Sequence, residues 1–309
     1  MSISQQATLR LSLISYKTLK NSEYLHKFTM ADAYFCRASS AFKGYCITQT
    51  QIETLRAYID GTSTTEEAVA LLVPYPEASS SPVEMKQRLG GLWTLLNDTA
   101  VNLEFAQPQV IKMLKHIRTL PGRPEPKGAG EDFIDLDNGF YWRELTDWGI
   151  NWADAFNSYS AQLFNAACPT QEERAVRKKR WNSACRYSAR LASTGDATLS
   201  LGASLDLATK AISEGLETDL TEQVSGYLDT AAQVFEHASG ELWRRCKETQ
   251  AEDVLSSSNG LWRGQAGYSM DRWQFWKDRW NSLAEQQAIS PNIRDLAKEA
   301  LSHMNMVEH

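Results

Sequence analysis

The chain has 309 residues and a mass of 34.8 kDa, with 38 acidic against 32 basic side chains and a formal net charge of −6. A mean hydropathy of −0.43 excludes an integral membrane protein, and 42% hydrophobic with 23% charged residues is typical of a globular rather than a disordered chain. The mildly acidic pI near 5.5 argues against general nucleic-acid binding, because phosphate backbones usually require a basic surface.

The N-terminal stretch lacks a continuous apolar run, since Arg10 interrupts its best part, so no secretory signal is predicted. No window offers about eighteen uninterrupted apolar residues, so no transmembrane helix is predicted. The five cysteines are odd in number, scattered and without a CxxC pair, which indicates reduced thiols. We therefore expect a cytoplasmic protein with no membrane span and no nucleic-acid partner, and a homodimer is among the alternatives for its assembly.

Helical periodicity follows the chain from residue 52 to residue 307. The expected helices are residues 52–59, 66–73, 83–105, 110–120, 141–166, 170–192, 199–217, 221–249, 269–287 and 290–307. Ser81-Pro82 and Ser290-Pro291 are start signals, since serine caps a helix and proline suits its first turn. We expect a bend at Gly90-Gly91. Residues 121–130, with three prolines and three glycines, form the clearest loop.

No stretch shows sustained period-two alternation with β-branched enrichment, so no sheet is expected. Continuous heptads are also missing, which argues against a coiled coil. The sequence predicts an all-α protein, a single-domain irregular helical bundle of about eight to ten helices. Residues 1–49 are expected to form an N-terminal arm packed on the core, and residues 50–309 the helical domain with its Pro/Gly loop at 121–130.

Ten tryptophans are many for this length, and they cluster. Trp148 and Trp152 are four residues apart, and Trp273, Trp276 and Trp280 share one helical face. Core packing between helices is one interpretation, in which each indole N–H finds a partner. The other is an aromatic-lined cavity that holds an apolar ligand or stabilises a cation over ring faces.

Common catalytic motifs give no direct answer. No GxSxG, HExxH, Walker loop or Rossmann fingerprint is present, and the five histidines lack metal-ligand spacing. His237 stands beside Glu236 on a predicted helix, where it suits an acid–base role or, in the favoured interpretation, a structural one.

The C-terminal third carries a distinctive pattern: GLWRG at 260–264, GYS at 267–269 and RWQFWK at 272–277. It resembles the closing segment of a large family of uncharacterised fungal helical proteins, grouped as a domain of unknown function. Weaker similarities occur at LWTLL, residues 92–96, and at residues 181–191, so the resemblance spans roughly the last two thirds of the chain. It implies a helical fold and no particular activity.

The chain is also similar in size, helical content and aromatic load to certain fungal sesquiterpene cyclases, the humulene synthases of tropolone–sesquiterpenoid pathways. This similarity implies a class I-like cyclase of secondary metabolism that converts farnesyl diphosphate to a cyclic hydrocarbon with Mg²⁺. Such an enzyme needs carboxylates and amides for Mg²⁺, arginine or lysine for the diphosphate, and an aromatic pocket that shields a carbocation from water.

The usual DDxxD and NDxxS/TxxxE runs of class I cyclases are not intact here. The nearest candidates for metal ligands are Asn97, Asp98 and Asn102 on one predicted helix and Asp206 and Glu214 on another. Residues 131–135 also have ED-x-x-D spacing, directly after the Pro/Gly loop. A solvated helix face with i,i+4 partners is the alternative for each acidic row, and Lys210 lies within the second.

Arg186 and Arg190, one turn apart beside apolar positions, are the candidates for diphosphate binding. Trp93, Trp273 and Trp276 are the candidates for lining the cyclisation pocket. The alternative function, from a different class, is a non-catalytic helical interaction or regulatory protein whose tryptophans all belong to the core.

Overall fold

A computed structural model of the chain describes residues 27, 29–127, 134–164, 167, 170–200, 205–220, 222–250, 255 and 260–309. Across these ranges the protein consists of helices and loops, with one isolated bridge between Lys43 and Tyr45, which confirms the all-α class. The described part forms an irregular helical bundle with thirteen labelled α-helices, α2 to α14. None of the described helices is long and apolar enough to cross a membrane.

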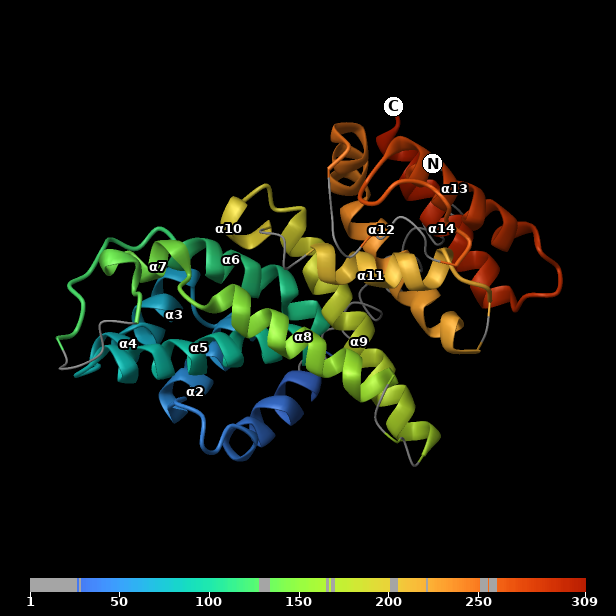
Figure 1. The fold of residues 1–309 in the computed structure, drawn as a ribbon. Helices are drawn as coiled ribbons and strands as arrows, with labels where there is room; N and C mark the ends of the chain where they lie inside the picture. Colours follow the sequence, from blue (N-terminus) through green and yellow to red (C-terminus); the bar gives the residue numbers. More distant parts are fainter. Residues whose placement is uncertain are drawn as a thin grey trace, which may run out of the picture. The chain divides into compact units, whose positions relative to one another are not determined.

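Contacts within the chain divide it into two compact units, one ending at Leu136 and one running from Asp137 to His309. Figure 1 colours the first from blue to green and the second from green through yellow to red. The boundary follows shortly after the loop predicted at 121–130, of which residues 121–127 are described. Most of the arm predicted at 1–49 lies outside the described residues, which begin at residue 27.

The first unit is built from one helix over residues 29–41 and five labelled helices. The labelled elements are α2 (Gln49–Ile59), α3 (Thr65–Leu72), α4 (Pro74–Glu77), α5 (Pro82–Asn102), the 3₁₀ turn η1 (Glu104–Ala106) and α6 (Gln107–Ile117). Thr48 and Thr64 close capping boxes at the starts of α2 and α3, and Ser81 caps α5 as predicted. The apolar faces of these helices meet around Leu55, Leu92 and Leu114, which are inaccessible to solvent.

Gly91 lets the chain before α2 approach α5 closely. A Cβ atom at Gly91 would overlap the carbonyl of Cys46, whereas a Cβ atom at the adjacent Gly90 would meet nothing within 4 Å. Both glycines lie inside α5, which continues through them to Asn102. The predicted bend at this glycine pair is therefore not what Gly91 provides. Its missing side chain makes room for the Cys46 backbone to pack against α5.

The two adjacent glycines provide a matched test of this contact. We expect Gly91→Ala to lower the free energy of unfolding by about 1–3 kcal/mol, because backbone atoms at Cys46 must move. Gly90→Ala should raise it by about 0.5–1 kcal/mol, because alanine favours the helix and restricts the unfolded chain. Urea unfolding followed by tryptophan fluorescence measures both. Equal effects of the two substitutions would contradict the packing role of Gly91.

The second unit contains nine described elements. They are η2 (Asp137–Gly139), α7 (Tyr141–Glu144), α8 (Trp148–Phe164), α9 (Gln171–Ala192), α10 (Ala197–Ser200), α11 (Leu205–Leu216), α12 (Glu222–Glu248), α13 (Met270–Glu285) and α14 (Pro291–Val307). The helix predicted at 141–166 is broken in two, because Leu145 and Asp147 adopt left-handed backbone conformations with φ of 52° and 61°. Thr170, Ser269 and Ser290 cap α9, α13 and α14.

Aromatic side chains fill the second unit at two places. Between α8 and α9, Trp152 packs edge-to-face against Tyr187 with ring centroids 5.0 Å apart, and its indole donates to Ser188 Oγ. Between α12 and α13, the Phe235 ring meets Trp273, Trp276 and Trp280 at centroid distances of 6.0, 6.1 and 6.1 Å. The tryptophans expected to share one helical face therefore do so, and that face lies against α12.

A fully buried ion pair connects α13 with the residue that follows α11. Arg272 Nη2 and Nε each lie 2.7 Å from a carboxylate oxygen of Glu217, and both side chains have an exposed fraction of 0%. The remaining donors are used as well: Arg272 Nη1 donates to the carbonyls of Leu255 and Gly267, and Trp276 Nε1 donates to Glu217 Oε1 at 2.8 Å. The pair is therefore both bidentate and hydrogen-bonded on its outer side.

The distinctive C-terminal pattern collects around this ion pair. The Arg272 guanidinium lies over the Trp262 ring at 5.1 Å, and the Leu261 N–H donates to the Glu217 carbonyl. Gly260 has φ of +56°, and a Cβ atom there would overlap that same carbonyl, so glycine is required on both counts. The residues of the closing segment thus have a shared structural task, which is to enclose Glu217.

The buried pair predicts a large asymmetry between breaking it and replacing it. Arg272→Met should lower the free energy of unfolding of the second unit by about 3–5 kcal/mol, because Glu217 is left buried without its counter-charge. The double substitution Arg272→Met with Glu217→Met should lose less than the single one, since no charge is then stranded. Arg244→Met, which removes a half-exposed arginine from ion pairs with Glu241 and Glu248, is the control and should change little. Urea unfolding of the four proteins tests this order.

Candidate anion-binding site

The residues proposed from the sequence fall in both units. Trp93, Asn97, Asp98 and Asn102 belong to α5 in the first unit, and Arg186, Arg190, Asp206, Glu214, Trp273 and Trp276 belong to α9, α11 and α13 in the second. Of the segment 131–135, residues 131–133 lie outside the described part of the chain.

The row on α5 faces the helix over residues 29–41. Asp98 is half-buried, and its Oδ2 accepts a hydrogen bond of 2.9 Å from the Tyr34 hydroxyl. Asn102 Nδ2 donates to the Asp98 carbonyl at 2.9 Å, and Asn97 and Trp93 are buried in the core of the unit. In the first unit Asn97 thus contributes to packing, Asp98 to a hydrogen bond between helices, and Asn102 to a hydrogen bond within α5.

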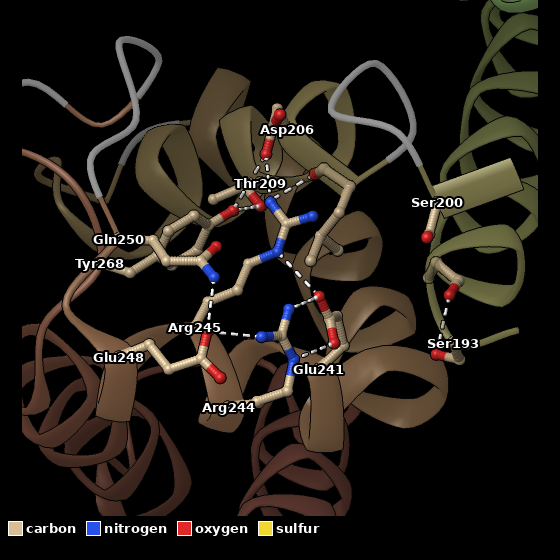
Figure 2. Close-up of polar contacts among 12 residues, drawn as sticks. Ser193, Ser200, Asp206, Thr209, Glu241, Arg244, Arg245, Glu248, Gln250 and Tyr268 are labelled. Atoms are coloured by element: carbon tan, nitrogen blue, oxygen red, sulfur yellow. Dashed lines mark hydrogen bonds and ion pairs between the residues drawn. The ribbon is translucent and has the colours of Figure 1, made fainter. Parts of the chain in front are cut away.

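The row on α11 points to different partners. Figure 2 shows Asp206 held by Arg245, whose Nη1 lies 2.6 Å from Asp206 Oδ1, while Glu241 occupies the other side of the same guanidinium at 3.0 Å. Glu214, two turns later, lies near Tyr227: burial and then the Glu214 charge raise the pKa of that phenol to about 12. Asp206 and Glu214 therefore do not converge on one point.

This arrangement does not fit a magnesium cluster. Mg²⁺ requires several hard oxygen ligands in near-octahedral geometry, and the Asp206 carboxylate is already neutralised by the buried Arg245. Among the described residues, no three His, Cys, Asp or Glu side chains come together in a way that could hold a metal ion. The row on α11 instead contributes to an ion-pair network with α12.

The tryptophans proposed as pocket walls are packed. Trp273 and Trp276 have exposed fractions of 1% and 0%, and each indole N–H has an acceptor: Glu308 Oε1 for Trp273 and Glu217 Oε1 for Trp276, both at 2.8 Å. Trp93 is likewise inaccessible to solvent. Their environment corresponds to the core-packing interpretation of the aromatic residues.

The two arginines proposed for diphosphate binding lie on a polar seam between α9 and α12. Four polar pairs join the two helices, and their order is the same along each helix. They are Lys178 with Asp229, Asn182 with Thr230, Arg186 with Gln233, and Ser193 with the His237 carbonyl. The order shows that the two helices run parallel here. In each pair a donor meets an acceptor, so the seam is complementary along most of its length.

Complementarity fails at one position of this seam, where Arg190 and His237 lie. Arg190 is half-buried, and no hydrogen bond to its guanidinium is found among the described residues. His237 Nε2 is buried without a hydrogen-bond partner, although Glu236 Oε1 lies 3.4 Å away in a geometry unsuitable for one. We call Arg186, Arg190, Gln233 and His237 the arginine–histidine site.

Electrostatics at this site favour an anion. Burial lowers the pKa of both Arg186 and Arg190, which shows that these cations have lost part of their hydration, and Glu236 partly opposes that shift. Burial and then Arg190, Arg186 and His303 lower the pKa of His237 to about 3, so the imidazole is neutral near pH 7. Two arginines and one glutamate leave a net charge of about +1.

The sequence indicates Arg186 and Arg190 as a pair and His237 separately, but it does not bring the three together. The i,i+4 spacing of Gln233 and His237 on α12 repeats that of Arg186 and Arg190 on α9, and that shared spacing is the only signal that could have paired them. Which two helices face one another is a property of the tertiary structure. Gln233, which accepts the hydrogen bond from Arg186 Nε, was not expected.

Fold and site together define an all-α protein with a half-buried basic site between two parallel helices. Residues 93–280, 188 of the 309 residues, match the family described as protein of unknown function (DUF3632). The chain therefore belongs to this family, in agreement with the resemblance seen in its closing segment. No curated protein and no solved structure matches the chain.

The unmatched arginine has a consequence for stability. We expect Arg190→Met to leave the free energy of unfolding unchanged or to raise it by up to about 1 kcal/mol, because it removes a desolvated charge while the methionine keeps the apolar stem. Arg186→Met should instead lower it by about 1–2 kcal/mol, since Gln233 loses its partner across the seam. Thermal and urea unfolding compare the two, and a larger loss for Arg190→Met would indicate that Arg190 has a structural role.

Proposed function

We propose that this protein works by binding a phosphate-bearing anion at the arginine–histidine site, as a non-catalytic helical ligand-binding or regulatory protein. The observation that carries the proposal is the half-buried Arg190 guanidinium beside the unpaired His237 Nε2, in a seam whose other pairs are matched. Functional sites commonly keep such unmatched groups because the ligand completes them.

The chemistry of arginine selects the class of ligand. Its planar guanidinium presents a fork of N–H donors that fits phosphate and carboxylate oxygens, and it stays charged even when partly desolvated. Arg186 and Arg190 are one helical turn apart, a separation that suits two neighbouring phosphoryl groups better than one small anion. Inorganic pyrophosphate is therefore the first probe.

A sesquiterpene cyclase acting on farnesyl diphosphate with Mg²⁺ is the second candidate. The same half-buried arginine pair supports it, since every class I-like mechanism must hold the leaving diphosphate. Against it stand the pairing of Asp206 with Arg245 and the close packing of Trp273 and Trp276. The non-catalytic proposal therefore ranks first, and the ligand on which both candidates converge is an isoprenyl or other organic diphosphate.

Calorimetric titration with pyrophosphate and with farnesyl diphosphate, each with and without Mg²⁺, tests the proposal. We expect saturable binding that Arg190→Met weakens by about 10-fold or more, because a charge-assisted hydrogen bond to phosphate is lost. Lys179→Met removes an exposed positive charge from the same helix and should leave the affinity nearly unchanged.

Product analysis of the same mixtures separates the two candidates. Binding of farnesyl diphosphate without diphosphate release supports the non-catalytic protein. A cyclic hydrocarbon that forms only with Mg²⁺ would establish the cyclase and overturn the first candidate. Absence of binding by both probes to the folded protein would reject both proposals.

A further inference from the structure

His237 lies at the centre of the arginine–histidine site and is its least satisfied group. Its ring nitrogen Nε2 is buried without a hydrogen-bond partner, while its backbone carbonyl is held by Ser193 Oγ. The helix therefore fixes where the imidazole stands, and the side chain is left with unused hydrogen-bonding capacity. A buried polar atom in this state is expected to gain a partner when a ligand arrives.

The charged groups around this imidazole come from each helix that packs on α12. From α9 these are Arg186 and Arg190, from α12 itself Glu236, and from α14 His303, which faces it as a further basic group. Among the described residues, no charged group of the neighbours α11 and α13 acts on the His237 imidazole, and three ion pairs engage charged residues on or next to these helices. Those pairs are Asp206 with Arg245, Glu217 with Arg272, and Lys277 with Glu308.

We propose that His237 is the third ligand-binding group of this site, and that a dianionic phosphate ligand binds there together with one proton, which His237 takes up from solvent. The proposal rests on the proposed binding function. No bond to phosphorus forms or breaks: the imidazole gains a proton and becomes a cation that donates a hydrogen bond to a phosphate oxygen.

Charge balance supports a dianion over a monoanion. With neutral His237 the two arginines and Glu236 sum to about +1, and with an imidazolium the sum is about +2, which matches a doubly charged phosphoryl group. A carboxylate carries a single negative charge and has no need of the added proton. The ligand class is therefore a phosphate monoester or a diphosphate.

The direction of the pH dependence follows from linkage. In the free protein, burial and the two arginines keep the pKa of His237 near 3. A bound dianion opposes both arginines, so the pKa of His237 must be higher in the complex. A group whose pKa rises on binding favours the complex at low pH, so affinity increases as the pH falls through the bound-state pKa and levels off below the free-state pKa.

Two measurements on the 309-residue chain test the inference. Proton–nitrogen NMR of the histidine rings, with and without inorganic pyrophosphate, reports the protonation of His237 directly. Calorimetry in two buffers of different ionisation enthalpy gives the number of protons taken up on binding. The variant His237→Gln identifies the His237 resonance and keeps a side-chain amide near the position of Nε2. His309→Gln, far along the sequence, is the control. If His237→Gln does not fold, His237→Asn takes its place.

The expected result is that pyrophosphate shifts the His237 pKa upward. The wild type and His309→Gln should take up at least half a proton more than His237→Gln at the same pH, and the ligand's own protonation cancels in that comparison. His237→Gln should also lose the pH dependence that the wild type shows beyond that of pyrophosphate itself. Pyrophosphate binding with equal proton uptake in all three proteins would overturn this inference and leave the proposed function standing, whereas no binding to the wild type would overturn both.

Discussion

The second unit is organised around a carboxylate and a guanidinium removed completely from water. Ions as hydrophilic as Glu217 and Arg272 are costly to bury, so the surrounding structure must supply every hydrogen bond that water would have made. The Trp276 indole and the Ser213 hydroxyl donate to Glu217, two loop carbonyls accept from Arg272, and the face of the Trp262 ring covers the guanidinium. The position of α13 relative to the end of α11 follows from this requirement.

The same requirement explains why the closing segment is so recognisable. Glycine is needed at 260 for a positive φ and a close approach, and Trp262, Arg272 and Trp276 each contact or enclose the buried pair. The pattern distributed over 260–277 thus describes the surroundings of a buried ion pair. The segment therefore identifies the family without indicating a reaction.

The seam between α9 and α12 differs from the buried ion pair, because not all of its polar groups are matched. Four of its pairs match a donor with an acceptor, as a stable helix interface should, but the Arg190 guanidinium and His237 Nε2 have no such partner among the described residues. A half-buried cation beside a histidine that it keeps neutral makes no favourable contribution to folding. Such an arrangement is what one expects where stability has been exchanged for the ability to bind an anion.

Much of the architecture could be predicted from local patterns. Apolar periodicity, the serine and threonine caps, and the Pro/Gly segment near 121–130 indicated the all-α class, most helix positions and the main loop, because these signals act within a few residues of one another. The division into two compact units came from the tertiary structure. Two residues in left-handed conformations, Leu145 and Asp147, broke a helix that periodicity alone predicted as continuous. Neither is a glycine, so the sequence carried no warning.

The candidate site depended on tertiary structure. An acidic row on a helix looks the same from its sequence whether it faces a metal, water or an arginine, and only the fold pairs Asp206 with Arg245 across 39 residues. Equally, only the fold brings the arginine row of α9 against His237 on α12. By itself the sequence determined the helical class, the helix caps and the family, because these follow from neighbouring residues or from the pattern of a whole segment. The tertiary structure decided which charged side chains are paired and which are not, because that depends on contacts between residues far apart in the chain.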